Sequence, residues 1–134
     1  MRLRTLMTAL AVSALGLGAL TLTAPTAAAS AQWMPSNCGS GNFCIYDNQN
    51  FGGRMWAWAG NNDDYTRSGA NDRASSWANN GIDDGWARVW VFQNTSWDHQ
   101  YGNLLACLGP GEAYASLDGS QDNQASAHTW EQRC

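Results

Sequence analysis

The stretch Ile45–Phe51 reads Ile-Tyr-Asp-Asn-Gln-Asn-Phe and runs directly into the glycine pair Gly52-Gly53. A related arrangement returns further along the chain in Val91–Trp97, which reads Val-Phe-Gln-Asn-Thr-Ser-Trp. A second repeat relates Asn71–Ser76, Asn-Asp-Arg-Ala-Ser-Ser, to Asp122–Ala127, Asp-Asn-Gln-Ala-Ser-Ala. The chain therefore contains two related halves, and the second has a few extra residues that we place near 98–102.

The apolar runs around these repeats are short enough to be strands. Turn residues separate them, and the clearest runs are Phe43–Tyr46, Met55–Trp58, Val89–Phe92, Leu104–Leu108 and Glu112–Leu117. No segment has sustained helical periodicity. The pattern predicts an all-β domain in which two units, neither able to bury its own inner face, pack into one sandwich. We expect the first unit at about 38–80, a linker at 79–85 and the second unit at about 86–134.

The N-terminal residues have the features of an export signal. Arg2 and Arg4 precede an apolar stretch that ends near Leu22, and the small-residue triplet Ala29-Ser30-Ala31 follows. The stretch is short and contains Gly, Ser and Thr, which argues against a retained membrane anchor. We therefore predict a signal peptide over 1–31, with cleavage after Ala29 as the alternative. The domain would then span 32–134, and the protein would be secreted into the extracellular space.

All four cysteines lie beyond the predicted signal, and an even number in an exported chain indicates disulfides. Of the three possible connectivities we favour Cys38–Cys44 with Cys107–Cys134. The first pair flanks a Gly-Ser-Gly turn, and the second would attach the last residue to the domain. A zinc site is the rival interpretation, but the sequence has no Cys-x-x-Cys pair and only two histidines.

The charge of the chain limits its partners. The formal net charge is −4 and every basic residue is an arginine, while the acidic residues occur in polar loops, for example Asp63-Asp64 and Asp83-Asp84. Nucleic acids and anionic membranes both require a basic face, so neither is expected as a partner. A bound cation is compatible with this charge.

Two aromatic residues separated by four others, then a glycine pair and a later Asn-Asp-x-x-Ser-Ser, resemble a βγ-crystallin Greek-key motif. In this interpretation the first hairpin folds back on itself, which requires a residue at positive φ, and Gly53 supplies it. Tyr46 and Phe51 would pack across the hairpin, and Ser76 would bond to its backbone. The second copy departs from the pattern, because its glycine is displaced and Ala127 stands where a serine is expected.

The resemblance narrows further around the first cysteine pair. The residues Cys38, Phe43, Cys44 and Tyr46, continuing through Asn50–Arg54, resemble a family of secreted metallopeptidase inhibitors, peptidase inhibitor family 36. The resemblance implies a βγ-crystallin-like sandwich of two Greek-key motifs stabilised by disulfides. It also implies an inhibitor whose partner is a secreted zinc endopeptidase. A fold alone does not establish an activity, so the target is an expectation.

Calcium is the cofactor that the βγ-crystallin resemblance implies. Carried over by position, one site would use Asn71, Asp72 and Ser75, and the other would use Asp122, Asn123 and Ser126. Each set has only one carboxylate, so we expect weak binding, at roughly 10⁻⁴ to 10⁻³ M. The alternative is that Asp and Asn only shape a turn while the serines satisfy the hairpin.

An inhibitor would be expected to present a rigid exposed loop to the cleft of a peptidase. The stretch around Cys107 is the candidate, with Leu105, Ala106 and Leu108 as its inhibitory residues, because apolar side chains suit thermolysin-like pockets. The same stretch also has the composition of a buried strand. We expect a monomer and no enzymatic activity, since neither His99 nor His128 lies in a catalytic motif.

Two other functions remain open at this point. One is a calcium-stabilised structural or stress-related surface protein. The other is a carbohydrate-binding module, because the chain has 8 tryptophans and exposed indoles can bind polysaccharide. We expect most of them, including Trp56, Trp58 and Trp90, to fill the core, and Trp33 to be exposed.

Overall fold

The computed structural model describes residues 33–95 and 103–134. The described chain forms strands and one short 3₁₀ helix, whose bounds are β1 (Phe43–Asn48), β2 (Gly52–Trp58), η1 (Tyr65–Ser68), β3 (Ser76–Asn79), β4 (Arg88–Phe92), β5 (Leu104–Leu108), β6 (Ala113–Tyr114) and β7 (Ala127–Glu131). None of the described residues belongs to a helix long and apolar enough to cross a membrane. The predicted signal peptide lies outside the described residues.

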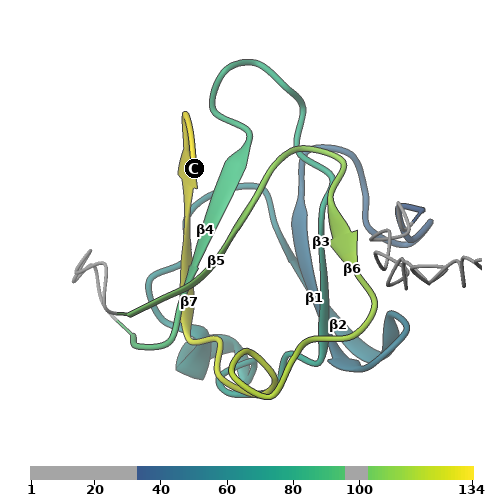
Figure 1. The fold of residues 1–134 in the computed structure, drawn as a ribbon, viewed down its shortest axis with the longest axis vertical. Helices are drawn as coiled ribbons and strands as arrows, with labels where there is room; N and C mark the ends of the chain where they lie inside the picture. The colour runs from purple at the N-terminus through teal and green to yellow at the C-terminus, as the bar shows by residue number, and fades with distance from the viewer. Residues whose placement is uncertain (1–32, 96–102) are drawn as a thin grey trace, which may run out of the picture.

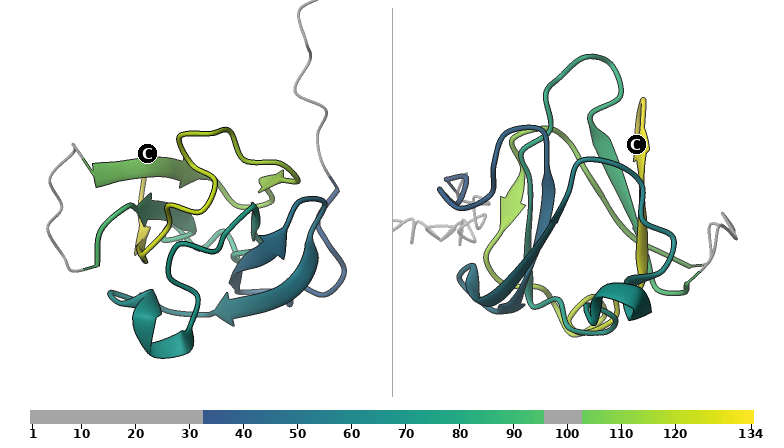
Figure 2. Two further views of the ribbon diagram at one scale, coloured as in Figure 1. Left: turned by 90° about the horizontal axis from the view of Figure 1, so that it is seen from below. Right: turned by 180° about the vertical axis from the view of Figure 1, so that it is seen from behind.

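The strands form two antiparallel sheets that pack face to face (Figure 1). One sheet has the order β2-β1-β3-β6 and the other β5-β4-β7. Each sheet also takes in a segment of the other half, because β6 pairs with β3, and Asn62 forms an isolated bridge with His128 of β7. Neither half can complete its sheet alone, so the two halves form one sandwich, as Figure 2 shows from two further sides.

The core lies between the sheets and follows the alternation of β1 and β4. Phe43 and Ile45 from one sheet meet Val89 and Val91 from the other, and all four side chains are fully buried. Most of the described tryptophans contact the core and Trp33 is exposed, as predicted, but the expectation for Trp90 was wrong. Trp90 alternates with the buried Val89 and Val91 on β4, so its ring lies outside the core, half-buried, and Trp86 is exposed. Trp56 and Trp77 are buried in this core, Trp58 and Trp130 pack against it, and Trp33 is 74% exposed.

The first hairpin, between β1 and β2, folds back on itself as the sequence predicts. Gly53 has φ +74°, and a Cβ there would lie 2.8 Å from the amide nitrogen of the Asn48 side chain. The rings of Tyr46 and Phe51 pack edge to face with centroids 5.4 Å apart. The hydroxyl of Ser76 donates to the Asn48 carbonyl at 2.7 Å and accepts from the Phe51 N–H at 3.0 Å. The corresponding hairpin of the second half includes 96–102, which lie outside the described residues.

Two disulfides join Cys38 to Cys44 and Cys107 to Cys134. The first closes the turn before β1. The second attaches the last residue to β5, and the indole N–H of Trp90 holds the same segment by donating to the Arg133 carbonyl at 2.9 Å. The fold predicted from the sequence, a disulfide-stabilised βγ-crystallin-like sandwich, is therefore confirmed.

The sequence did not reveal β3 and β7. Their residues, Ser-Trp-Ala-Asn and Ala-His-Thr-Trp-Glu, have neither a continuous apolar run nor an apolar–polar alternation. All four residues of β3 are nevertheless buried, because neighbouring strands flank it on both sides and other parts of the chain cover its two faces. Their strand character comes from this tertiary setting.

Candidate functional site

The two segments predicted to bind calcium, 71–76 and 122–127, lie side by side. The Asp72 N–H donates to the Ala125 carbonyl at 3.0 Å, and the Asn123 N–H donates to the Ala74 carbonyl at 2.8 Å. These bonds are reciprocal, because Asp72 and Asn123 hold the same position in their repeats, as do Ala74 and Ala125. Asp72 and Asn123 also share a left-handed backbone, with φ of 55° and 56°. The sequence repeat is therefore also a repeat of backbone structure.

The polar side chains of these segments leave two acceptors without partners. The Asn71 amide donates to the Asp72 carboxylate at 2.7 Å, the Asn123 amide donates to the Asp122 carboxylate at 3.2 Å, and the Ser126 hydroxyl donates across to Asp72 at 3.3 Å. Oδ1 of Asn71 and Oδ1 of Asp122 are buried, and neither has a hydrogen-bond partner. A buried acceptor without a partner is costly, and both stand at the first position of their repeats.

The main-chain N–H groups of Ser75 and Ser126 tie the two segments to the first strand of each half. Ser75 donates its N–H to the Tyr46 carbonyl at 2.8 Å, and Ser126 donates its N–H to the Phe92 carbonyl at 2.9 Å. Across the part of the chain that the structure describes, no group of three or more His, Cys, Asp or Glu side chains could hold a metal ion. A cation at either segment would therefore depend on amide, hydroxyl and carbonyl oxygens beside a single carboxylate.

His128, one of the two histidines, is fully buried in a network of neutral groups. Its Nε2 lies 2.9 Å from the Gly60 carbonyl and its Nδ1 lies 2.7 Å from the Tyr65 hydroxyl. Since a carbonyl can only accept, Nε2 carries the proton and Nδ1 accepts from the tyrosine. Burial disfavours the charged ring and lowers the pKa of His128 to about 4. At neutral pH this residue is an uncharged link between β7 and the segment before η1.

The residues predicted to form an inhibitory loop lie in a strand instead. Leu105, Ala106 and Leu108 belong to β5, which forms the edge of its sheet. Leu108 is fully buried, and the other two pack against the core. The backbone pairing with β4 and the disulfide at Cys107 fix this stretch in the body of the domain. It is therefore not a protruding loop, and the other interpretation of the sequence, a strand, is correct.

Two exposed apolar side chains lie close together in a different place, in the predicted linker 79–85 and at the residue that follows it. Ile82 and Trp86, in the connection between β3 and β4, are 65% and 55% exposed. Beside them is a hollow of about 460 Å³, lined among others by Gly60, Asn61 and Trp130. The signal available in the sequence was an isolated Ile and Trp among Gly, Asn and Asp, but their exposure depends on the fold around them.

Comparison with known proteins gives a family and a fold. The sequence model described as peptidase inhibitor family I36 matches residues 31–103. No curated protein matches the chain. Among solved structures, a βγ-crystallin from Ciona intestinalis is 22% identical with a TM-score of 0.53, covering 68% of this chain and all of that one.

Two further solved structures agree. A structure described as concerning the evolution of the eye lens βγ-crystallin domain fold is 22% identical with a TM-score of 0.58, covering 74% of this chain and 93% of the other. A βγ-crystallin from an archaeon is 21% identical with a TM-score of 0.50, covering 69% and 99%. At these identities the likeness concerns the fold alone.

Proposed function

This chain belongs to peptidase inhibitor family I36, and from that premise we propose that it is a secreted, non-enzymatic inhibitor of zinc endopeptidases. The observation that carries the proposal is the family match over residues 31–103, more than half of the sequence. The more specific part of the proposal is that the target is a zinc peptidase. It rests on the resemblance of the segment from Cys38 to Arg54 to secreted metallopeptidase inhibitors.

The scaffold supports an inhibitory role. Binding costs conformational entropy whenever a surface must become ordered, so an inhibitor gains affinity from a surface that is already fixed. Two disulfides and two sheets that exchange segments supply such a frame. Disulfides also persist in the oxidising space outside the cell, where a secreted peptidase works.

The test is an inhibition assay with the purified, oxidised protein. We expect it to inhibit a thermolysin-like zinc endopeptidase at micromolar concentration or below, and to leave a subtilisin-like serine peptidase and a papain-like cysteine peptidase active. The reduced and alkylated protein is the control, since it keeps the sequence and loses the fixed surface. If the oxidised protein leaves all three enzymes fully active, the proposal fails. Inhibition of the serine or cysteine enzyme instead would refute only the zinc class.

We also propose that calcium binds weakly to the two paired segments. Asn71, Asp72 and Ser75 would hold one ion, and Asp122, Asn123 and Ser126 the other. The support is the pair of buried acceptors, Oδ1 of Asn71 and of Asp122, which are oxygens of the kind that calcium prefers and have no hydrogen-bond partner. With one carboxylate in each set, dissociation constants of about 10⁻⁴ to 10⁻³ M are expected.

Calcium titration by calorimetry, together with the thermal midpoint, tests the assignment. Asp122→Asn keeps the size of the side chain and removes its charge, so it should weaken the binding heat and reduce the rise of the midpoint with calcium. Asp83→Asn is the matched control, because Asp83 is an exposed carboxylate in a surface ion pair with Arg88. Equal heats for both variants and the unsubstituted protein would show that the ions do not bind at these segments.

The same buried acceptors favour one alternative function, a structural protein stabilised by calcium. A large rise of the thermal midpoint with calcium, combined with no inhibition of any peptidase, would support it. A carbohydrate-binding module is the other alternative. Adsorption to insoluble chitin or cellulose, lost when the exposed Trp33 or Trp86 is replaced by alanine, would support that function instead.

A further inference from the structure

The connection between β3 and β4, residues 80–87, projects from one end of the sandwich (Figure 1). We call it the Ile82 loop. It carries two of the large apolar side chains that are exposed in the described structure, Ile82 at 65% and Trp86 at 55%. Exposed apolar groups that lie close together on a secreted domain indicate a contact surface. The question is whether the loop is fixed well enough to serve as one.

A single buried side chain holds both ends of the Ile82 loop. Asn79 is fully buried, and its Oδ1 accepts from the Gly81 N–H at 2.9 Å. Its Nδ2 donates to the Ala87 carbonyl at 2.7 Å and to the Leu108 carbonyl at 3.0 Å. The entry to the loop, its exit and strand β5 therefore share one set of bonds. Buried hydrogen bonds of this kind are costly to break, so the base of the loop is rigid.

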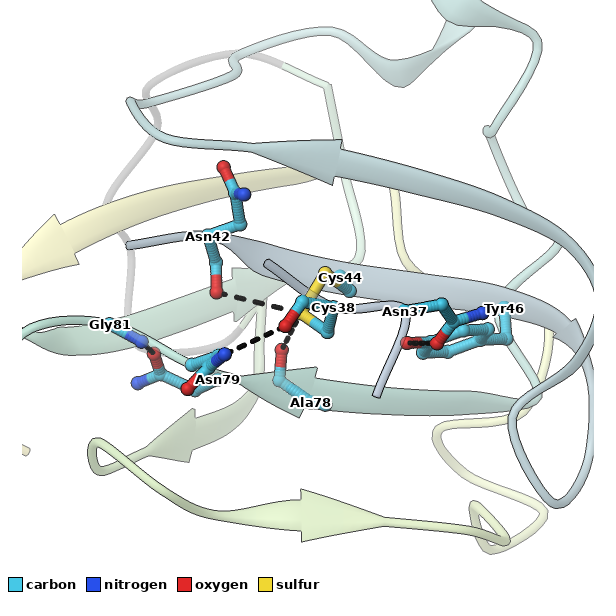
Figure 3. The surroundings of a disulfide bond; sticks show 9 residues. Asn37, Cys38, Asn42, Cys44, Tyr46, Ala78, Asn79 and Gly81 are labelled. Carbon is cyan, nitrogen blue, oxygen red and sulfur yellow. Dashed lines mark hydrogen bonds between the residues drawn. A yellow bond between two sulfur atoms is a disulfide. The ribbon is translucent and has the colours of Figure 1, made fainter. Parts of the chain in front are cut away.

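The disulfide-closed turn supports the loop from the side. The Asn80 side chain donates to the Cys38 carbonyl at 2.7 Å, and its backbone pairs with Asn42 at 2.9 Å and Gly41 at 2.7 Å. Figure 3 shows the Cys38–Cys44 bridge beside Asn79 and Gly81. At Gly81 any Cβ would lie 2.6 Å from the Trp130 ring, so the backbone packs directly on the indole. The first disulfide thus braces the Ile82 loop as well as β1.

The exposed part of the loop is bonded within itself. The Asp84 N–H donates to the Ile82 carbonyl at 2.8 Å, and the Asp84 carboxylate accepts from the Trp86 N–H at 2.9 Å. Asp83 forms an ion pair with Arg88 at 3.1 Å. The two apolar side chains therefore stand on a short backbone whose shape is set before any partner arrives.

We propose that the Ile82 loop is the peptidase-docking surface of this inhibitor, with Ile82 entering an apolar specificity pocket of the enzyme and Trp86 packing at its rim. The inference rests on the proposed function. A peptidase cleft is concave, and its specificity pocket takes one side chain, which matches a projecting loop with a branched aliphatic residue exposed on it. The loop also lies within the residues that match the inhibitor family.

The fixed shape of the loop matters for affinity. A side chain on a mobile segment would lose conformational freedom on binding, and this loss would offset part of its contact energy. Here Asn79 and the first disulfide have already removed that freedom. Interfaces of this type concentrate their affinity in a few anchor residues, of which tryptophan is one of the commonest. Ile82 and Trp86 should therefore dominate the inhibition constant.

The experiment measures the inhibition constant of the Ile82→Asp and Trp86→Ala variants against the zinc endopeptidase that the unsubstituted protein inhibits. Each should raise it on the order of 30-fold or more, which is the effect of losing an anchor residue. Tyr114→Ala is the matched control, because Tyr114 is another exposed aromatic residue, on β6, and it should change the constant less than about 3-fold. Both test residues are exposed, so thermal midpoints should stay close to the unsubstituted value.

Hydrogen exchange on the complex gives a second measurement that does not depend on variants. The amides of 80–88 should exchange more slowly in the complex than in the free inhibitor. If the unsubstituted protein inhibits while both loop variants inhibit equally well, the inference is overturned and the proposed function stands. If the unsubstituted protein inhibits no peptidase, both fall. If the loop variants lose only adsorption to chitin, the loop binds sugar and the inference is again overturned.

Discussion

Lowering the pH from about 7.5 to about 4.5 is expected to destabilise the folded protein through His128. In the native state this ring is enclosed, with its two nitrogens bonded to the Gly60 carbonyl and the Tyr65 hydroxyl. Protonation would place a charge where no carboxylate forms a hydrogen bond to the ring. The unfolded chain has no such restriction, and its histidine takes up a proton at the ordinary pKa of about 6.5.

The size of the effect follows from the two pKa values. The pKa of His128 is about 4 in the folded protein, so the unfolded state binds more protons than the folded state between about pH 6.5 and 4. Stability is therefore complete above the unfolded pKa and falls as the pH falls through this window. With 1.36 kcal/mol for each pKa unit, the loss is about 1 kcal/mol at pH 5.5 and about 2–3 kcal/mol at pH 4.5.

Urea denaturation at these pH values measures the loss directly. His128→Gln is the informative variant, because it is less stable throughout but has no ring to titrate, so its stability should change little across the window. His99→Gln is the control and should keep the full pH dependence. Asp64 and Asp118 accept hydrogen bonds that lower the pKa of each carboxyl. These carboxylates therefore take up protons only below the pH window in which His128 titrates. Parallel stability profiles for the unsubstituted protein and His128→Gln would refute the reasoning, as would an NMR titration that placed the folded pKa near 6.5.

Three further predictions concern the frame of the fold, all measured by urea or thermal denaturation of the oxidised protein. Gly53→Ala should lower the free energy of unfolding by about 1–2 kcal/mol or more, because Gly53 has a positive φ. Gly119→Ala is the control and should be nearly neutral, because a Cβ there would have open space around it. Equal losses for the two variants would contradict the folded-hairpin geometry. Ser76→Ala should cost about 1–3 kcal/mol, because it leaves the hairpin N–H and carbonyl without their buried partner; no loss would mean that water replaces the hydroxyl. Replacing both cysteines of the C-terminal disulfide by serine should lower the free energy of unfolding by about 3.5 kcal/mol, and the same change at the Cys38–Cys44 disulfide should lower it by about 2 kcal/mol. The difference is expected because the two disulfides close loops with sequence separations of 27 and 6. The reverse order would show that loop entropy does not explain the stabilisation here.

The first hairpin was the most predictable part of the fold, because its requirements are local. A backbone at positive φ with a crowded Cβ position calls for glycine, and Gly53 stands there. The two aromatic rings that pack across the hairpin lie only a few residues away in sequence. By contrast, β3 consists of four residues with no strand pattern of their own, and it exists because β1 and β6 flank it. Information of that kind is distributed over the whole chain.

The candidate sites differ in the same way, because one could be predicted from the sequence and the other depends on the whole fold. The repeat in the sequence was enough to select Asn71 and Asp122 as corresponding positions, and the structure adds that an oxygen of each is buried without a partner. The Ile82 loop could not be recognised in this way. What makes it a candidate is the side chain of Asn79, whose bonds to both ends of the loop are a consequence of burial, and burial of a lone polar residue has no sequence signature.

The two proposed sites lie at opposite ends of the sandwich (Figures 1 and 2), and β3 runs from one to the other. Segment 71–76 ends at Ser76, the first residue of β3, and Asn79, its last residue, holds the Ile82 loop. The strand is buried along its whole length and paired on both sides, so it has little freedom to change shape when an ion binds. Calcium at the paired segments should therefore raise the free energy of unfolding while leaving the inhibition constant unchanged. Stability and docking can then be lost separately, by Asp122→Asn at one end and by Ile82→Asp at the other.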